Sequence, residues 1–249
     1  MTTLQQELRR LYQPADGADD LADAHGRVRC LVLELTSPPD WAELSPVWQG
    51  VQRDLDLSAP AIAVSGTDGL QLWFSLAEPV AAARGHVFLE GLRVRFLPGV
   101  KPGRVRLLPA PGASAAHPEL HARPVPALQR GEEGNWSAFV APDLAPVFAD
   151  TPWLDIPPSE EGQAELLRRL QPVSPAAFEA AWQQLGGQGV RASGRPEAEA
   201  PQAPHAGAAT AASGAAGEAQ AFLLQVMRDE GVALALRIEA ARALLPSGR

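Results

Sequence analysis

The chain has 249 residues and a mass of 26.3 kDa, which suffices for one core of ordinary size with appendages or for two small domains. Hydrophobic residues make up 46%, so the composition allows a globular core. The formal charge of −8 argues against broad, sequence-independent binding to nucleic acid, because phosphate contacts need clustered Lys and Arg. A local basic strip is still compatible with this charge.

Helices and strands alternate through the first half of the chain. Apolar residues at helical spacing predict a helix over residues 4–12, and the apolar run 28–35 predicts a buried strand. Asp40 is expected to cap a helix over 41–51. The turn residues between 61–65 and 70–76 predict a β-hairpin. Pro79 is expected near the start of a helix that reaches Leu92, and alternating patterns predict strands over 93–97 and 104–108.

The second half begins with a long loop, residues 109–134, which is rich in proline and glycine and has no periodicity. A strand is predicted over 136–140 and a short helix over 142–148. Two further helices are predicted over 159–170 and 174–185, each with a serine at its start. Together these elements predict an α+β domain over residues 1–185, with a mixed or antiparallel sheet and flanking helices.

The C-terminal residues change character. Residues 186–217 consist mainly of Gly, Ala, Pro and Ser and predict a flexible, disordered linker. Residues 218–246 predict a helical hairpin with one apolar face. Its sequence over 222–229 and 236–246 resembles small-terminase-like phage proteins, and a pair of helices this short is expected to dock on its own domain, a second copy or a protein partner.

Cysteine usage and the N-terminus indicate the compartment. Cys30 is the single cysteine, so neither a disulfide framework nor a cysteine metal site is available, and its apolar neighbours predict a small buried side chain. The first residues lack the pattern of a signal peptide, and no apolar run approaches the ~20 residues of a membrane span. We therefore expect a cytoplasmic protein with no membrane partner.

Three segments contain the polar residues that point to a function. The predicted strand ends in Glu34-Leu35-Thr36, the hairpin reads SGTDGLQLW over residues 65–73, and the segment 104–112 reads RVRLLPAPG. In this order, residues 28–115 resemble the archaeo-eukaryotic primase superfamily, which has the primase-polymerase fold. In that family the strand ends in two acidic residues separated by one apolar residue, and the hairpin reads Ser-Gly-x-x-Gly-apolar-His-apolar-aromatic.

Two positions depart from the family pattern. Thr36 stands where the second acid would be, and Gln71 stands at the histidine position. Two-metal nucleotidyl transfer needs carboxylates that hold both ions, and glutamine can neither titrate nor carry a positive charge. The resemblance therefore implies a degenerate catalytic site in which Glu34 is the one remaining candidate metal ligand.

Two functions follow from this resemblance. The first is a non-enzymatic nucleic-acid-binding, nucleotide-binding or adaptor protein of replication or mobile-element origin, with single-stranded nucleic acid or a nucleotide as partner and no cofactor. A local basic strip is predicted from the alternation of Arg93 with Arg95 and of Arg104 with Arg106. The predicted binding residues are Ser65, Gly66, Gly69, Gln71, Arg104 and Arg106.

The alternative is a nucleotidyl or phosphoryl transfer enzyme that uses Mg²⁺ or Mn²⁺ at a rearranged site. It would combine Glu34 with Asp40, Asp68 or another acid. A scaffold protein whose groove has been filled is a third possibility. The sequence favours the interpretation without enzymatic activity.

Each motif residue also has a purely structural interpretation. Ser65, Gly66 and Gly69 serve equally well as turn formers. Glu34 is typical of a strand-end acid that is solvated or paired with an arginine, and Gln71 is expected on a solvated face of the sheet. His117 and His121, with Glu119 between them, have a spacing that suits a metal pair on a helix, but the loop composition argues against a helix there.

Overall fold

The computed structural model describes residues 1–14, 21–114, 116–129 and 134–186. The predicted hairpin over 218–246 and, apart from Gly186, the predicted linker lie outside these residues, so the predicted division of the chain stays a prediction. Within the described ranges, no helix has the length and apolar character needed to cross a bilayer.

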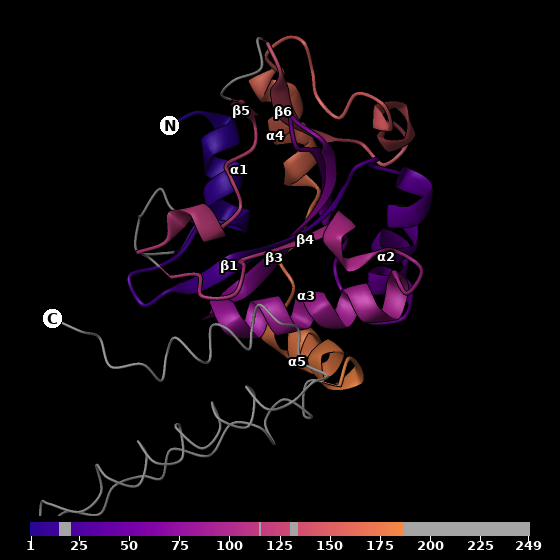
Figure 1. Ribbon diagram of the computed structural model, residues 1–249. Helices are drawn as coiled ribbons and strands as arrows, with labels where there is room; N and C mark the ends of the chain where they lie inside the picture. Colours follow the sequence, from indigo (N-terminus) through magenta and orange to yellow (C-terminus); the bar gives the residue numbers. More distant parts are fainter. Residues whose placement is uncertain (15–20, 115, 130–133, 187–249) are drawn as a thin grey trace, which may run out of the picture. The chain divides into compact units, whose positions relative to one another are not determined.

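The domain is α+β and is built on one six-stranded sheet (Figure 1). The strand order is β4-β1-β3-β2-β6-β5, and the pairings between these strands are antiparallel, which confirms the predicted fold class. The strands are β1 (Arg27–Thr36), β2 (Ala61–Val64), β3 (Gly69–Ala81), β4 (Val105–Leu108), β5 (Ala127–Leu128) and β6 (Trp136–Val140).

Helices cover both faces of the sheet (Figure 1). The helices are α1 (Thr3–Leu11), α2 (Trp41–Arg53), α3 (Ala82–Phe96), α4 (Glu160–Arg168) and α5 (Pro175–Gln184), with 3₁₀ turns at Pro102–Arg104, Pro118–Leu120 and Ala145–Phe148. Side chains of α2, α3 and α5 share one core with one face of the sheet, and those of α1 and α4 share a second core with the other face.

Three helices begin at the capping residues that the sequence predicted. Asp40 accepts a hydrogen bond from the N–H of Ala42 at 2.7 Å, and Ser159 and Ser174 cap α4 and α5 through their hydroxyls. Each side chain satisfies a backbone donor that has no partner inside the first turn. These helices therefore begin where their capping residues predicted.

Two predicted elements are wrong. Residues 93–97 do not form a strand, because the apolar spacing of Phe88, Leu89 and Leu92 continues α3 to Phe96. Pro79 does not open this helix. It lies inside β3, in the stretch where the pairing with β1 shifts register, so its missing N–H interrupts no regular ladder.

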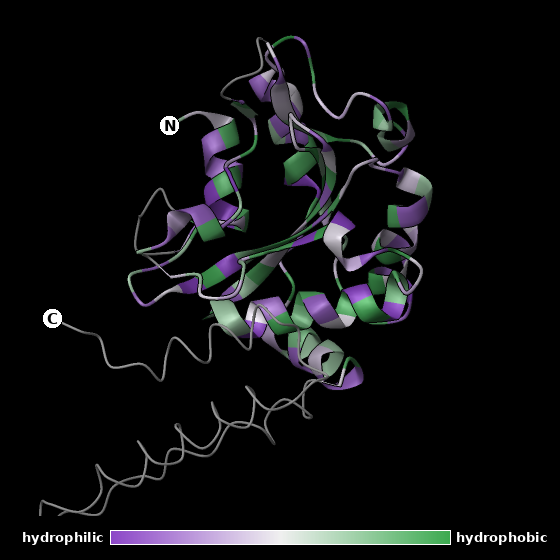
Figure 2. Cartoon of the chain, in the orientation of Figure 1, coloured by the Kyte–Doolittle hydropathy of each residue, from purple (hydrophilic) through white to green (hydrophobic). Residues whose placement is uncertain are grey.

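Side chains alternate along β1 between the two cores. Hydrophobic residues, green in Figure 2, recur along the strands of the sheet and on the helices that cover it. Leu31, Leu33 and Leu35 of β1 point toward α2 and α3, whereas Cys30 and Val32 point toward α1 and α4. Cys30 is buried, as predicted. The same alternation puts Glu34 and Thr36, at the end of β1, on the face that carries Cys30 and Val32.

Candidate functional site

Three of the residues singled out from the sequence lie next to one another across the sheet. Glu34 of β1 pairs in register with Gln71 of β3 on one side and with Arg106 of β4 on the other. We call Arg106, Glu34 and Gln71 the polar row. Cross-strand neighbours lie close enough for their side chains to interact, so the fold joins residues that are far apart in the chain.

Glu34 is a buried carboxylate. Its side chain is 5% exposed, and its Oε2 lies 3.6 Å from Nη1 of Arg106. The carboxylate lies directly against Gly69, where an added Cβ would come within 3.0 Å of the glutamate side chain. Gly69 has no left-handed backbone angle, so its role here is to leave room for Glu34.

The protonation of Glu34 follows from this environment. Burial raises the pKa of the Glu34 carboxyl above its ordinary value, because water no longer solvates the charged form. The Arg106 guanidinium and a hydrogen bond from Gln71 lower this pKa, whereas the negative charge of Asp68 raises it. The net direction is upward, so burial outweighs the two favourable contacts of the charged form.

Gln71 is held inside the domain. Its side-chain oxygen accepts a hydrogen bond of 2.8 Å from Nε1 of Trp73, and its residue is 9% exposed. The prediction of a solvated Gln71 is therefore wrong, because Trp73 lies two residues on, on the same strand face, and covers it. The amide joins Trp73 to the carboxylate of Glu34.

Arg106 joins two carboxylates. Its Nη1 lies 3.2 Å from Oδ1 of Asp68, its Nη2 lies 3.3 Å from Oδ2 of the same residue, and the second carboxylate is that of Glu34. The Arg106 side chain is 53% exposed. Asp68 and Glu34 thus converge on one guanidinium at the end of β1, whereas Asp40, the other acid considered, is engaged as the cap of α2.

Thr36 and Arg104 have structural contacts. The Thr36 hydroxyl donates to the carbonyl oxygen of Arg104 at 3.3 Å. The Arg104 guanidinium donates to both carboxylate oxygens of Glu43, at 2.7 and 3.2 Å, and to the carbonyl oxygens of Pro38 and Thr36. Through these hydrogen bonds Arg104 links the start of α2 to the end of β1.

The serine-glycine segment forms the turn of the hairpin. The Ser65 hydroxyl oxygen accepts hydrogen bonds from the N–H of Gly69 at 2.9 Å and of Thr67 at 3.2 Å. Gly66 has a φ of 80°, and its N–H donates to the carbonyl oxygen of Pro152. These groups act as turn formers, and their predicted role in binding a ligand stays a prediction.

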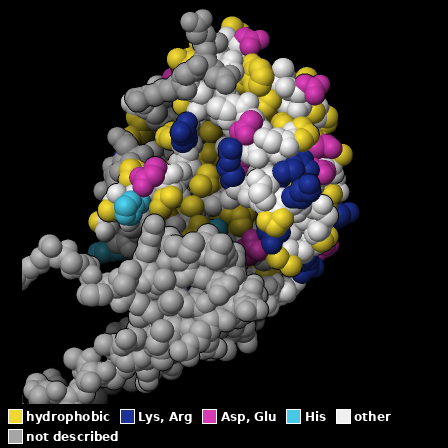
Figure 3. Space-filling view, viewed as in Figure 1, with side chains coloured by type: hydrophobic (Ala, Val, Ile, Leu, Met, Phe, Trp, Pro, Cys, Tyr) yellow, Lys and Arg dark blue, Asp and Glu magenta, His cyan; other side chains and the backbone are white. Residues whose placement is uncertain are grey.

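The predicted pairing of Arg93 with Arg95 on one face of a strand is wrong, because both lie on a helix, where residues two apart point in different directions. Arg93 pairs with Glu90 at 2.6 Å, and Arg95 lies 4.0 Å from Asp54. Figure 3 shows Lys and Arg side chains dispersed among Asp and Glu on the face in view.

The two histidines of the long loop, His117 and His121, have different hydrogen-bond partners. His117 Nδ1 lies 3.1 Å from Oε1 of Glu119, and Nε2 of His121 lies 3.2 Å from the carbonyl oxygen of Ser114. Across the described ranges, no three His, Cys, Asp or Glu side chains are grouped in a way that could hold a metal ion.

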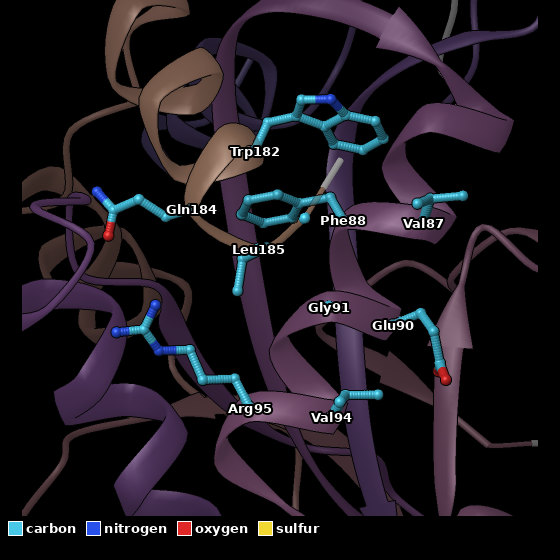
Figure 4. Close-up of a pocket in the computed structure, with 10 residues that line it drawn as sticks. Val87, Phe88, Glu90, Gly91, Val94, Arg95, Trp182, Gln184 and Leu185 are labelled. Atoms are coloured by element: carbon cyan, nitrogen blue, oxygen red, sulfur yellow. The ribbon is translucent and has the colours of Figure 1, made fainter. Parts of the chain in front are cut away.

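An apolar cavity of about 400 Å³ lies between α3 and α5 (Figure 4). Phe88, Val94, Trp182 and Leu185 contribute to its walls, and Arg95 lies at its margin. Of the candidate residues from the sequence, Arg95 lines it, but the polar row belongs to other elements. The cavity suits an apolar group better than a phosphate.

Sequence reasoning missed two partners that shape the site, Trp73 and Glu43. The signal for Trp73 was present, because residues two apart on a strand share a face and an indole N–H seeks an acceptor when buried. Glu43 carried no such signal, since its contact with Arg104 joins segments that only the tertiary fold brings together.

Comparisons with known proteins give structural likenesses but no sequence family. No family model and no curated protein matches the chain. The polymerase domain of Ligase D from Mycobacterium tuberculosis, solved in complex with DNA, is similar over 58% of this chain and 52% of that chain, with 22% identity and a TM-score of 0.37. The chain thus spans about half the length of that solved chain.

Proposed function

We propose that this protein is a non-catalytic, primase-like domain that binds single-stranded nucleic acid or a nucleotide at the polar row. One observation carries the proposal: the guanidinium of Arg106 lies between the carboxylates of Glu34 and Asp68. In two-metal transfer, divalent cations neutralise the carboxylates and the phosphates. Here the single positive charge of Arg106, which belongs to the chain itself, lies against both carboxylates.

The contacts of the neighbouring residues support the loss of catalysis. Gln71 is engaged with Trp73, and Thr36 donates to a backbone carbonyl, so neither side chain is directed at a reacting phosphate. The role of Glu34 is limited by its burial, which favours the neutral acid over the charged form that binds a metal.

Arg106 supports the retention of phosphate binding. Its guanidinium is a rigid fork of donors that matches phosphate oxygens. Its distances to the two carboxylates, 3.2 to 3.6 Å, are longer than the ~2.7–2.9 Å of a strong charge-assisted hydrogen bond. A phosphate can therefore compete for this half-exposed side chain.

The proposal is tested by fluorescence anisotropy of a labelled oligothymidylate with the full chain at low salt. Arg106→Ala is expected to weaken binding about tenfold and to reduce the salt slope by about one. Arg168→Ala is the matched control, because this arginine is 56% exposed and paired with Glu165 on α4. Binding that ignores salt, or no binding at low salt, would overturn the proposal.

The metal-dependent enzyme remains the second candidate, and the convergence of Glu34 and Asp68 on one point favours it. A divalent cation that displaced Arg106 would meet oxygens of both carboxylates. Primer extension with Mn²⁺ distinguishes the two functions. Nucleotide incorporation above background that is lost in Glu34→Gln would establish the enzyme and refute the non-catalytic proposal.

We also propose an adaptor role for residues 218–246, which lie outside the described residues. Their resemblance to small-terminase-like phage proteins supports recruitment of a protein partner and an origin in replication or mobile-element biology. Deletion of these residues is expected to leave oligothymidylate binding unchanged, and a loss of that binding would assign them to the nucleic-acid site instead.

A further inference from the structure

The turn between β2 and β3 lies in the middle of the sheet and has an arginine on either side. Arg106 comes from the outer strand β4 and contacts Asp68 of the turn at 3.2 and 3.3 Å. Gln129, which follows the outer strand β5, lies against Gly66 of the turn, because an added Cβ there would come within 3.0 Å of the Gln129 side chain. The Gln129 side-chain oxygen accepts a hydrogen bond of 3.3 Å from Nη1 of Arg123. Two guanidiniums thus approach the same turn from opposite ends of the sheet.

Arg123 has no carboxylate partner among the described residues. Arg123 is exposed, and its guanidinium takes part in none of the ion pairs of the described ranges. Its hydrogen bond goes to the neutral amide of Gln129, which does not offset the charge. Arg104, by contrast, is held by both carboxylate oxygens of Glu43. Arg123 therefore keeps its charge and its remaining donors for a phosphate.

Trp153 adds an aromatic ring beside the turn. The N–H of Gly66 donates to the carbonyl oxygen of Pro152 at 3.0 Å, so Trp153 directly follows the residue that is bound to the turn. Trp153 is half-buried and belongs to neither core of the described domain. Its indole N–H donates to Oδ1 of Asp155 at 3.2 Å, a contact that engages the edge of the ring and not its faces. A held, partly exposed indole is suited to stack on a nucleic-acid base.

Trp153 lies on the sheet face that carries the polar row. Trp136 of β6 and Leu154 pair through two backbone hydrogen bonds, of 2.8 and 3.0 Å, and Leu154 packs against the core on the side of α2 and α3. Side chains alternate along an extended chain, so Trp153 and Asp155 point to the opposite face. That face is the one of Gln71, whose neighbour on β2 belongs to the other core. The indole and the polar row therefore lie on one side of the sheet.

We propose that the nucleic-acid site extends from the polar row across the hairpin turn, so that Arg106 and Arg123 bind different phosphates of one single strand and a base of this strand stacks on Trp153. The inference rests on the proposed function and names its ligand as a single strand rather than a mononucleotide. The reason is that the turn separates the two guanidiniums, so two phosphates are needed to engage both. Stacking accepts any base, so the site should show little sequence preference.

The role of Arg123 is tested by fluorescence anisotropy of labelled oligothymidylate with the full chain over a series of salt concentrations. Arg123→Ala should weaken binding about tenfold and reduce the salt slope by about one. Arg53→Ala is the matched control, because this exposed arginine at the end of α2 belongs to the helix layer on the opposite face and also takes part in none of the ion pairs of the described ranges. It should change neither the affinity nor the slope.

The role of Trp153 is tested with the same assay. Trp153→Ala should weaken binding about tenfold without changing the salt slope, because it removes a stacking surface and no charge. Trp153→Phe keeps an aromatic face and should retain most of the affinity. An abasic oligomer with the same number of phosphates should bind the wild type about as weakly as oligothymidylate binds Trp153→Ala. This last comparison needs only the wild type, so it decides the question even if Trp153→Ala does not fold.

The outcomes separate this inference from the proposed function. Absence of salt-dependent oligothymidylate binding, or binding that Arg106→Ala leaves unchanged, would refute the proposed function and the inference with it. Where wild-type binding and the effect of Arg106→Ala stand, three results would each overturn the inference alone. These are equal binding by Arg123→Ala and Arg53→Ala, equal affinity for the abasic oligomer and oligothymidylate, and binding of thymidine monophosphate as tight as that of oligothymidylate.

Discussion

The contact between Gly69 and Glu34 gives a prediction whose sign depends on a second residue. A Cβ at position 69 would come within 3.0 Å of Glu34, and the three nearest atoms all belong to that side chain. Gly69 does not have a positive φ, so its backbone accepts an alanine without strain. The cost of Gly69→Ala should therefore come from the glutamate alone.

The magnitude follows from two opposing effects. Overpacking against a buried side chain costs about 1–3 kcal/mol. The displaced carboxylate would also lose its hydrogen bond from Gln71 and its ion pair with Arg106. In a Glu34→Ala background the clash disappears, and replacing a glycine at a permissive position stabilises by ~0.4–1 kcal/mol, because the unfolded chain loses conformational freedom. Gly69→Ala should thus destabilise the wild type by about 2 kcal/mol and stabilise the Glu34→Ala variant.

Urea unfolding of the four proteins in this double-mutant cycle measures the effect. Gly103→Ala is the control, because no atom lies within 4 Å of an added Cβ there, and its effect on the free energy of unfolding should be the same in both backgrounds within ~0.5 kcal/mol. If Gly69→Ala has the same effect in both backgrounds, within ~0.5 kcal/mol, the carboxylate does not lie against this glycine and the described site is wrong.

Three further predictions concern the same domain. Burial raises the pKa of Glu34, so the native state keeps a proton that the unfolded state releases above about pH 4.3. The free energy of unfolding should therefore fall as the pH rises from about 4.3 to the higher pKa of the native state. In urea unfolding, Glu34→Gln should lack this fall. An equal difference between wild type and variant at low and neutral pH would contradict it. The Gln163 side chain accepts a hydrogen bond from the N–H of Phe139 at 2.7 Å and donates one to the C=O of Phe139 at 2.9 Å. Gln163→Leu should therefore lower the free energy of unfolding by about 2–4 kcal/mol, whereas Gln183→Leu, at an exposed position, should change it little. Similar losses in the two variants would show that these hydrogen bonds do not stabilise the domain. The Cys30 thiol is buried and its pKa is raised, so iodoacetamide should modify it only as the protein unfolds, and rapid labelling in native buffer would show an accessible thiol.

Local chemistry made much of the fold predictable. Capping side chains and the apolar run of β1 act within a few residues, and so do the turn residues of the hairpin, which is why α2, α4, α5 and the β2–β3 pair were predicted with their types and near their bounds. The errors at Pro79 and at residues 93–97 have a different origin. A proline suits either a helix start or an irregular strand, and a short alternating pattern also fits a helix, so packing against the sheet decided both.

Part of the candidate site could likewise be predicted from the sequence, and part of it could not. The sequence by itself determined that Glu34 ends a buried strand and that Gln71 stands on a hairpin beside it, because strand order and turn chemistry fix those positions. Only the tertiary structure decided that Trp73 holds the Gln71 amide and that Arg104 is fastened to Glu43. It also placed Arg106 between Glu34 and Asp68. These contacts depend on which side chains the register of non-neighbouring strands makes adjacent, and one long arginine reaches several acids until packing selects among them.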